Sequence, residues 1–311
     1  MMDLPEDWPV ARYRLTFEVT KPMTLPDYGG SAIRGAFGHA LRRTACMTHQ
    51  TSCPSCPLYR TCPYAAIFEP PPPAEHELQR FSSVPVPYVI EAPLGGRRTI
   101  EAGERLSFTV VLFGRAIEQL ALIIYAFERA FRHEVFQGGG ELQSWVWLPQ
   151  EGGEVEVWSK DEPKIKPHQP VLRLPVDVGA PAVRLRFLTQ LRLQHNGRAY
   201  GPGNIELQPF LSALIRRSSL LREFHAEKHV FDFKGLMELA SDVRGEPAFD
   251  WKYWRRFSTR QKQGMYMGGV TGEWVLRDVP AELVYFLGLG SWIHVGKNAS
   301  FGLGRYELSL M

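Results

Sequence analysis

The chain has 311 residues, of which 44% are hydrophobic and 12% aromatic, and its formal net charge is +3. This apolar content is enough for a sizeable core, and the length favours two domains over one. No run of about 18 uncharged apolar residues occurs, and the acidic start MMDLPEDWPV lacks the basic and apolar segments of a secretory signal. We therefore expect neither a membrane span nor export, and a soluble cytoplasmic protein is the default interpretation.

The charge is unevenly distributed along the chain. Residues 1–180 hold 18 Lys and Arg against 21 Asp and Glu, whereas residues 181–311 hold 18 against 12. Two stretches of the second half, 184–198 and 252–262, contain cations and no acid, and aromatic residues are interleaved with the second stretch. Local positive fields are what polyanion binding requires, whatever the total charge. A solvated basic face is the alternative for either stretch alone, and the two together favour nucleic acid.

The first elements are a strand and a helix. Apolar and polar residues alternate over residues 12–19, which is the period of a half-buried strand. After a loop that contains Gly29 and Gly30, Ser31 offers an N-cap for a helix in which Ile33, Phe37 and Leu41 recur at four-residue spacing.

The rest of the first half alternates loops with regular elements. A cysteine-rich insertion follows the helix, over about 46–64, and the proline run 70–73 ends it as a stiff spacer. The pattern then predicts a strand over 106–112, a largely buried helix over 117–131 and a short hairpin over 145–158. Five prolines between residues 160 and 181 make this the best linker candidate, so we place the domain boundary there.

The second half repeats this order. The elements that we expect are a strand over 183–193, a helix over 210–224, strands near 257–262 and 265–276, a helix that starts at Pro280, and a last strand over 301–310. Strand, helix, two strands, helix, strand is the ferredoxin-like order. The sequence thus predicts an α+β protein with two tandem ferredoxin-like domains, one over 1–170 with the cysteine-rich insertion and one over 181–311.

All four cysteines, Cys46, Cys53, Cys56 and Cys62, lie within 17 residues. Cys53 and Cys56 form a two-residue knuckle of the kind that wraps a tetrahedral metal, and Cys46 and Cys62 flank it closely enough to complete four ligands. Thiolates suit structural zinc, and an iron–sulfur cluster, free thiols or a disulfide are the alternatives. A closed four-thiolate site leaves no open position, so we assign it to stability and not to catalysis.

A glycine-rich segment, GKNASFGLGRY, covers residues 296–306. Glycine lets a backbone approach a phosphate closely, and Lys297 and Arg305 supply charge. The segment follows a helix and precedes a strand, which is the wrong order for a Walker loop or a Rossmann fingerprint. The residues alone leave phosphate binding and a structural turn open.

In its place between a final helix and the last strand, this segment resembles the glycine-rich signature of CRISPR-associated RAMP proteins. More narrowly, the chain resembles the precursor-CRISPR-RNA processing endoribonucleases, the sixth numbered Cas family. The resemblance spans nearly the whole chain in ordered pieces, which are residues 33–42 (IRGAFGHALR), 62–70 (CPYAAIFEP), 216–217 (RR), 256–261 (RFSTRQ), 267–272 (MGGVTG) and 294–297 (HVGK).

The resemblance implies two ferredoxin-like domains with RNA bound across them, and one cut in each CRISPR repeat without a metal. The 2′-hydroxyl attacks the adjacent phosphate and leaves 2′,3′-cyclic phosphate and 5′-hydroxyl ends. Such chemistry needs a base, an acid and a cation for the phosphorane, and histidine suits the first two roles. The implied partners are precursor CRISPR RNA, mature crRNA and a CRISPR effector complex.

The resemblance also points to individual residues. A histidine in or just after the first helix does the proton transfer in this family, and His39 matches that position, with Arg42 and Arg43 one turn on. His49 is the reserve candidate, and Tyr28 fits the family's tyrosine role; a structural histidine and a packed loop aromatic are the alternatives. Some relatives use a lysine near the histidine, but none lies between Lys21 and Lys160, so arginine would have to substitute.

The catalytic set that we predict is His39, Tyr28 and Arg43. The predicted RNA-binding set is Arg34, Arg42, Arg216, Arg217, Arg256, Arg260, His294, Lys297 and Arg305. The alternative interpretations are a non-cleaving RNA-binding subunit of a CRISPR effector complex and a DNA-binding zinc module in a regulator. The sequence gives neither the repeat that is recognised nor the oligomeric state.

Overall fold

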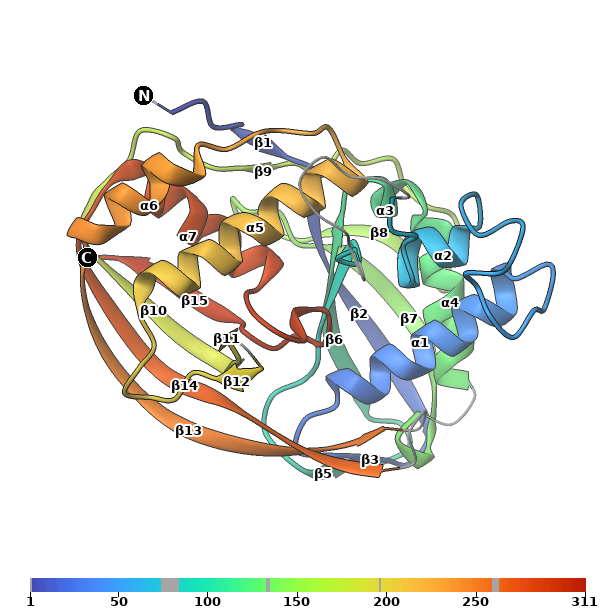
Figure 1. Ribbon diagram of the computed structural model, residues 1–311. Coiled ribbons are helices and arrows are strands. Elements are labelled where there is room, and N and C mark those ends of the chain that lie inside the picture. The colour runs from blue at the N-terminus through green and yellow to red at the C-terminus, as the bar shows by residue number, and fades with distance from the viewer. Residues whose placement is uncertain (1, 74–83, 133–134, 196, 259–262) are drawn as a thin grey trace. The chain divides into compact units, whose positions relative to one another are not determined.

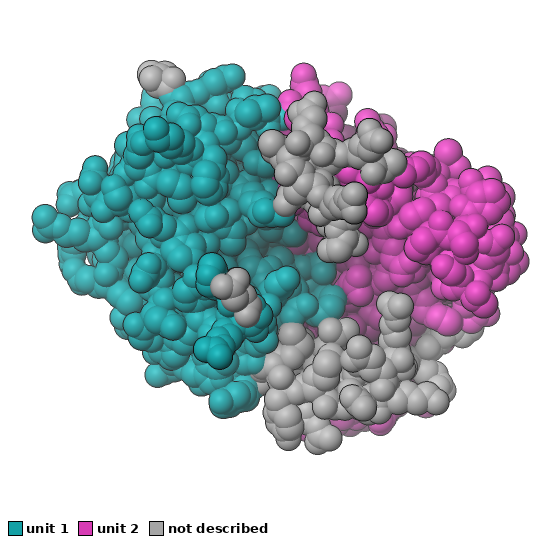
Figure 2. All heavy atoms as spheres, in the orientation of Figure 1, with its two compact units in different colours: residues 1–8, 171–219, 229–311 teal, residues 9–170, 220–228 magenta. Residues whose placement is uncertain are grey.

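The computed structural model describes residues 2–73, 84–132, 135–195, 197–258 and 263–311, and it leaves the side chains of 254–267 undescribed. The fold is mixed α+β, as predicted (Figure 1). The chain divides into two compact units (Figure 2): unit 1 holds residues 1–8, 171–219 and 229–311, and unit 2 holds residues 9–170 and 220–228. In the described part of the chain, no helix is long and apolar enough to span a membrane.

Unit 2 is built on a five-stranded antiparallel sheet in the order β4-β6-β2-β7-β8. Its central strand is β2, in which Tyr13, Leu15 and Phe17 are buried and alternate with half-buried polar residues, as the period predicts. The elements of this unit are β2 (Val10–Lys21), β3 (Met23–Leu25), α1 (Gly30–Ala45), α2 (Pro63–Phe68), β4 (Tyr88–Glu91), β5 (Arg98–Ile100), β6 (Arg105–Phe113), α3 (Arg115–Glu118), α4 (Leu120–Arg132), η1 (Val135–Gln137), β7 (Gly139–Trp147) and β8 (Val155–Ser159).

The core of unit 2 lies between this sheet and the helices α1 and α4. Phe37 of α1 stacks on Phe127 of α4 with ring centroids 4.3 Å apart, and Phe17 of β2 stacks on Phe131 of α4 at 4.0 Å. Aromatic stacking adds to the burial of these large side chains. The helix α1 is therefore fixed by one apolar face, and its opposite face is left to solvent.

Unit 1 contains a four-stranded antiparallel sheet in the order β13-β14-β10-β15. Phe187 of β10 packs on Tyr306 of β15 at 5.2 Å, and Trp274 of β14 packs on Phe210 of α5 at 5.7 Å. The elements are β1 (Asp7–Trp8), β9 (Leu172–Arg173), β10 (Ala180–Leu191), β11 (Gln194–His195), β12 (Arg198–Ala199), α5 (Leu207–His225, of which residues 220–225 belong to unit 2), α6 (Phe233–Asp242), β13 (Arg244–Ser258), β14 (Gln263–Val279), α7 (Ala281–Ile293), η2 (Ala299–Phe301) and β15 (Tyr306–Leu310).

Several elements were not predicted from the sequence, and β4, α6 and β13 show the reasons. The strand β4 is a run of four buried residues, and so short a run shows no period. The helix α6 lies in a segment to which we assigned no element. The strand β13 begins at Arg244 although it contains Gly245 and Pro247, which read as breakers; Pro247 is tolerated because β13 is at the edge of the sheet. The strand expected near 257–262 is thus corrected to the end of β13 at Ser258, and residues 259–262 lie outside the described residues.

The start of α1 also differs by two residues from the prediction. The N-cap is Gly29, not Ser31, and the helix begins at Gly30. A Cβ at position 29 would lie 2.8 Å from the ring of Phe136, so this close approach explains why glycine occupies the position.

Candidate nucleic-acid interface

The exposed face of α1 carries a stripe of residues that we call the α1 stripe, defined as Ala32, Gly35, His39 and Arg43. These residues recur at the three- and four-residue spacing of one helix face, and all four are exposed, whereas Ile33, Phe37 and Leu41 are buried on the other side. A Cβ added at Gly35 would meet nothing within 4 Å, so no packing contact in the protein requires glycine there. The stripe presents an imidazole and a guanidinium one turn apart beside small residues.

The position of His39 is fixed by the packing of its neighbours. Gly38 lies directly against the ring of Phe68 in α2, where a Cβ would overlap the ring. Phe68 also packs on Phe37 at 6.2 Å and on Tyr88 at 6.1 Å. Because α2 holds this part of α1 so closely, the exposed imidazole is carried by a rigid backbone.

Two arginines of α1 are engaged within unit 2. The Arg34 guanidinium lies over the Phe68 ring, 4.3 Å from its centroid. The Arg42 guanidinium donates to the carbonyl oxygens of Gln50 and Thr51 and lies 5.9 Å from the centroid of the Tyr64 ring. Arg42 thus ties the segment after the helix back to α1, and among these cations only Arg43 belongs to the exposed stripe.

Tyr28 and His49 lie before and after α1, and their side chains differ in exposure. Tyr28 is 8% exposed in the loop before α1, which supports the packed-aromatic interpretation. His49 is exposed in the cysteine-rich segment and has a left-handed φ of 52°. Roles for these two residues stay predictions.

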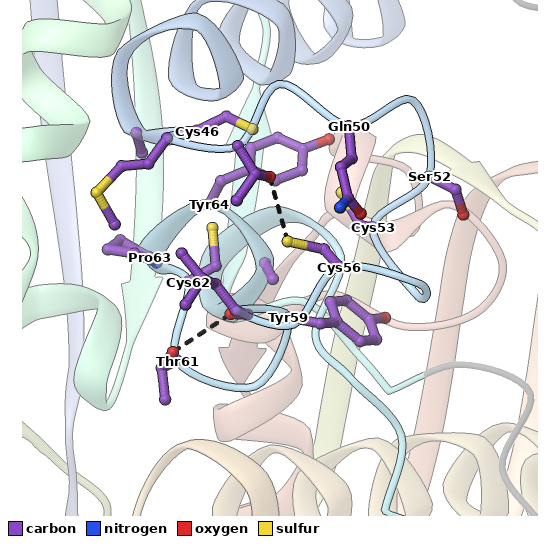
Figure 3. Close-up of a pocket in the computed structure, with 15 residues that line it drawn as sticks. Cys46, Gln50, Ser52, Cys53, Cys56, Tyr59, Thr61, Cys62, Pro63 and Tyr64 are labelled. Atoms are coloured by element: carbon purple, nitrogen blue, oxygen red, sulfur yellow. Dashed lines mark hydrogen bonds between the residues drawn. The ribbon is translucent and has the colours of Figure 1, made fainter.

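The four cysteines line one small cavity of about 70 Å³ (Figure 3), and all four are free and half-buried. The hydroxyl of Thr48 lies 3.3 Å from the sulfur of Cys56. Burial alone would raise the pKa of Cys46, but hydrogen bonds from the backbone amides of His49 and Thr48 and from the Thr48 hydroxyl outweigh burial and lower this pKa. Among the described residues, no three His, Cys, Asp or Glu side chains are arranged as ligands of one metal ion, so the zinc site stays a prediction.

The glycine-rich segment of unit 1 uses its backbone amides inside the unit. The amide of Lys297 donates to the carbonyl of Arg192 at 2.9 Å, and that of Gly304 donates to the carbonyl of Gln190 at 3.0 Å. Gly296 and Gly304 have φ of 89° and 68°, and a Cβ on either would collide with backbone of Arg192 or Val295. These glycines are explained by close backbone packing against β10 and its continuation, which favours the structural turn over a phosphate cradle.

The charged residues near this segment differ in access. Lys297 is exposed and Arg305 is half-buried, whereas His294, the residue that ends α7, is fully buried with φ 59°. The Nε of Arg217 donates to the carbonyl of Ile293 at 3.0 Å, and burial lowers the pKa of this guanidinium to about 10. Lys297 is therefore the exposed cation of this segment. Arg217 instead contacts the end of α7 through its hydrogen bond to Ile293.

Three other predicted RNA-binding residues lie elsewhere. Arg216 is exposed on α5. Arg256 lies in β13 among the residues whose side chains are not described, and Arg260 lies outside the described residues.

Two of the four arginines in the basic stretch 184–198 have acidic neighbours in the sheet of unit 1. Arg184 lies 3.8 Å from Glu273, and Arg186 lies 3.8 Å from Glu307, both across neighbouring strands. The acids are separated from these arginines by more than 80 positions in the chain, so the local composition could not reveal the pairing. The field expected from this stretch is correspondingly weaker.

One aromatic pair, exposed Tyr253 and half-buried Trp251, was present in the sequence but not assigned to the site. Tyr253 on β13 is 74% exposed, and its ring centroid lies 5.9 Å from that of Trp251. Its cross-strand neighbour is Gly268, which has no side chain to cover it. The aromatic residues interleaved with the second basic stretch were the available signal.

Two family models match the chain. A model described as an N-terminal domain, AF_1859_N, matches residues 8–170. A model described as CRISPR-associated endoribonuclease Cas6 matches residues 185–306. Among curated proteins, no significant match was found.

Solved structures with the same fold share little sequence with the chain. A Cas6 product complex is 17% identical with a TM-score of 0.59 and covers 96% of this chain and 99% of its own. A Thermus thermophilus Cas6 is 16% identical with a TM-score of 0.53 and covers 98% of this chain and 100% of its own. A partial Cas6-RT-Cas1–Cas2 complex is 14% identical with a TM-score of 0.60; there the match covers 99% of this chain but 47% of the larger one.

Proposed function

The chain belongs to the CRISPR-associated endoribonuclease Cas6 family of RAMP proteins, with an AF_1859_N domain over residues 8–170, and from this premise we propose that it cuts precursor CRISPR RNA within its repeats. The single observation that carries the proposal is the α1 stripe. It presents His39 to solvent with Arg43 one turn away, on a helix whose other face is locked in the core.

The fold proposed for this function is a pair of ferredoxin-like domains. Two observations support it. In unit 2, β2, α1, β4, β6, α4 and β7 follow one another, and the sheet order is β4-β6-β2-β7 with β8 added at the edge. In unit 1, β10, α5, β13, β14, α7 and β15 follow the same order, and the sheet order β13-β14-β10-β15 is equivalent. The domain limits 1–170 and 181–311 remain part of this proposal.

The proposed reaction needs no metal. The imidazole of His39 takes the proton of the 2′-hydroxyl, the bond from the 2′-oxygen to phosphorus forms, and the bond from phosphorus to the 5′-oxygen breaks. The Arg43 guanidinium stabilises the negative charge of the phosphorane. The departing 5′-oxygen needs a proton, and we propose that Tyr28, which the resemblance implies as a catalytic residue, supplies it. A Tyr28→Phe variant that cuts at the parental rate would assign this proton to solvent.

The RNA backbone is bound, in this proposal, by cations that stand in solvent. Arg43, Arg216 and Lys297 are exposed in the structure and are the first choices, and Arg305 is half-buried. Arg256 and Arg260 remain choices from the sequence. Mature crRNA and CRISPR-associated proteins are proposed partners. The likeness to one chain of a partial Cas6-RT-Cas1–Cas2 complex supports them, and this chain covers 47% of that chain.

A second candidate is a crRNA-binding subunit that does not cleave. The observation that favours it is the composition of the α1 stripe, which offers one imidazole, and the burial of Tyr28 beside it. Such a protein would have the same fold and the same cations but no working acid–base pair.

The experiment that tests both is cleavage of labelled repeat RNA from the host's own CRISPR locus in the presence of EDTA. One cut that leaves a 2′,3′-cyclic phosphate and a 5′-hydroxyl is the expected result. Tight binding without a cut would establish the non-cleaving subunit, and weak binding compared with random RNA would contradict both proposals.

A further inference from the structure

The segment from Cys46 to Cys62, which we call the cysteine loop, has no core of its own. Not one of its 17 residues is buried. Its half-buried side chains include all four cysteines, and Cys53 and Cys62 reach the edge of the unit 2 core. A chain segment that buries so little apolar surface is ordered by some other cross-link, which in small folds is commonly a disulfide or a metal.

The backbone of the cysteine loop already forms the turn that a metal knuckle needs. The amide of Cys56 donates to the carbonyl of Cys53 at 2.9 Å, which closes the turn through Pro54 and Ser55. A second turn follows, in which the amide of Tyr59 donates to the carbonyl of Cys56 at 3.0 Å.

Hydrogen-bond donors in the loop point at sulfur atoms. The backbone amides of Thr48 and His49 and the Thr48 hydroxyl bond to Cys46, and the Thr48 hydroxyl also lies 3.3 Å from the sulfur of Cys56. Donors aimed at sulfur are the usual outer partners of metal thiolates, because they stabilise the charge that remains on the sulfur. An inert thiol has no need of three such donors.

The four cysteines are among the residues that line one small cavity, and Tyr64 also lines it (Figure 3). A zinc ion with Zn–S bonds of about 2.3 Å would hold its sulfurs about 3.8 Å apart, and no three described side chains stand in such an arrangement. Each cysteine has one side-chain torsion, so a change of rotamer in an exposed loop moves its sulfur inward. Metal binding and the final ordering of ligands are commonly coupled in this way.

From these observations we propose that Cys46, Cys53, Cys56 and Cys62 bind one structural Zn²⁺ ion through four thiolates. Zinc fits because it accepts a tetrahedral set of soft sulfur ligands and has no redox chemistry of its own. The site is closed by protein ligands and takes no part in RNA cleavage. This inference does not depend on the proposed function, since a metal can be measured without RNA.

The zinc ion would join the two helices that hold the α1 stripe. Cys46 is the C-cap of α1, and Cys62 is the N-cap of α2, whose Phe68 packs under Gly38. A cross-link between these two caps fixes the last turn of α1, which carries Arg43. Loss of the metal should therefore loosen the end of α1 first and leave unit 1 unaffected.

The test begins with the full chain, purified without chelator and analysed for metals by mass spectrometry. About one zinc per chain is expected, and Cys56→Ser and Cys62→Ser should each lose most of it and lower the melting temperature. Met47→Ser is the matched control, because Met47 is 76% exposed in the same loop and is not a ligand; it should keep the zinc.

Metal exchange keeps the proposal testable if the cysteine variants fail to fold. Zinc released from the native chain with a mercurial should be replaced by Co²⁺ after the thiols are restored, with the visible absorption of a tetrahedral cobalt thiolate. Four titratable thiols in a zinc-free native chain, a disulfide found by mass spectrometry, or iron with acid-labile sulfide would each overturn the proposal. If a chain purified without zinc still cut RNA, the proposed function would hold and the zinc proposal would fail.

Discussion

The α1 stripe of unit 2 and the glycine-rich segment of unit 1 look alike in sequence, but the structure uses them differently. The stripe combines Gly35 with His39 and Arg43, and the segment combines glycines with Lys297 and Arg305 and follows closely on His294. In α1, Gly35 is surrounded by open space, and His39 and Arg43 stand in solvent. In the glycine-rich segment, Gly304 is packed against the backbone of Val295. The amides of Lys297 and Gly304 donate to the carbonyls of Arg192 and Gln190, and His294 before the segment is buried. Glycine marks an accessible backbone in the first region and close packing in the second.

The largest effect that we expect from this contrast is a loss of cleavage rate when His39 is replaced. We expect His39→Ala to slow cleavage of repeat RNA about 10²- to 10⁴-fold, the range of a lost general acid or base, because the imidazole stands in solvent and supports no packing. Single-turnover kinetics at saturating RNA measure this effect. The melting temperature and the RNA affinity should stay close to those of the parent.

His49→Ala is the matched control for that experiment. His49 is also exposed and lies ten residues on, in the cysteine loop. If His49→Ala loses the activity and His39→Ala keeps it, the catalytic role passes to the cysteine loop and the assignment of the α1 stripe is wrong.

The second effect is a loss of stability when a glycine of the glycine-rich segment is replaced. Gly304→Ala places a Cβ at φ 68° against the carbonyl of Val295, so we expect the free energy of unfolding to fall by about 1–3 kcal/mol or more. Chemical denaturation followed by fluorescence measures this change. Gly203→Ala is the control, because an added Cβ there meets nothing within 4 Å; equal losses in both variants would show that packing is not the reason for Gly304.

A smaller effect separates exposed cations from neutralised ones. Lys297 stands in solvent, whereas Arg186 lies 3.8 Å from Glu307 on the next strand. If Lys297 contacts one phosphate of a single-stranded RNA, Lys297→Ala should reduce the slope of log affinity against log salt by about 0.7. Arg186→Ala should leave that slope unchanged. Binding isotherms at several salt concentrations decide this, and a reversed order would place the RNA on the open face of the unit 1 sheet.

The sequence predicted those features that depend on near neighbours. The alternation in β2 and the apolar face of α1 are local periods, so they indicated both elements. The pairing of Arg184 with Glu273 and the bonds from the glycine-rich segment to Gln190 and Arg192 join residues far apart in the chain. No local pattern encodes such contacts. For this reason the sequence could not decide between a phosphate-binding segment and a structural turn, and it overestimated the positive field of residues 184–198.

The elements that were missed have the same kind of cause. The strand β4 is recognised by its place beside β6 and not by its four residues, and β13 is tolerated with Pro247 only because it is an edge strand. Tyr28 was assigned from a resemblance, and its burial depends on the fold around the loop. A family resemblance thus named the catalytic candidates, but it could not give their exposure, and their roles stay predictions.

The smallest effect tests whether the open space at Gly35 is used. Glycine in a helix interior destabilises it relative to alanine, so Gly35→Ala should raise the free energy of unfolding by about 0.5–1 kcal/mol, and Ala32→Gly on the same stripe should lower it by a similar amount. If RNA lies against the α1 stripe, the added methyl of Gly35→Ala, one turn before His39, should also weaken RNA binding or cleavage several-fold. A variant that is more stable and fully active would mean that the RNA does not approach this turn of α1. In that case His39 would be reached from its Arg43 side, and the glycine at position 35 would have no explanation in the structure.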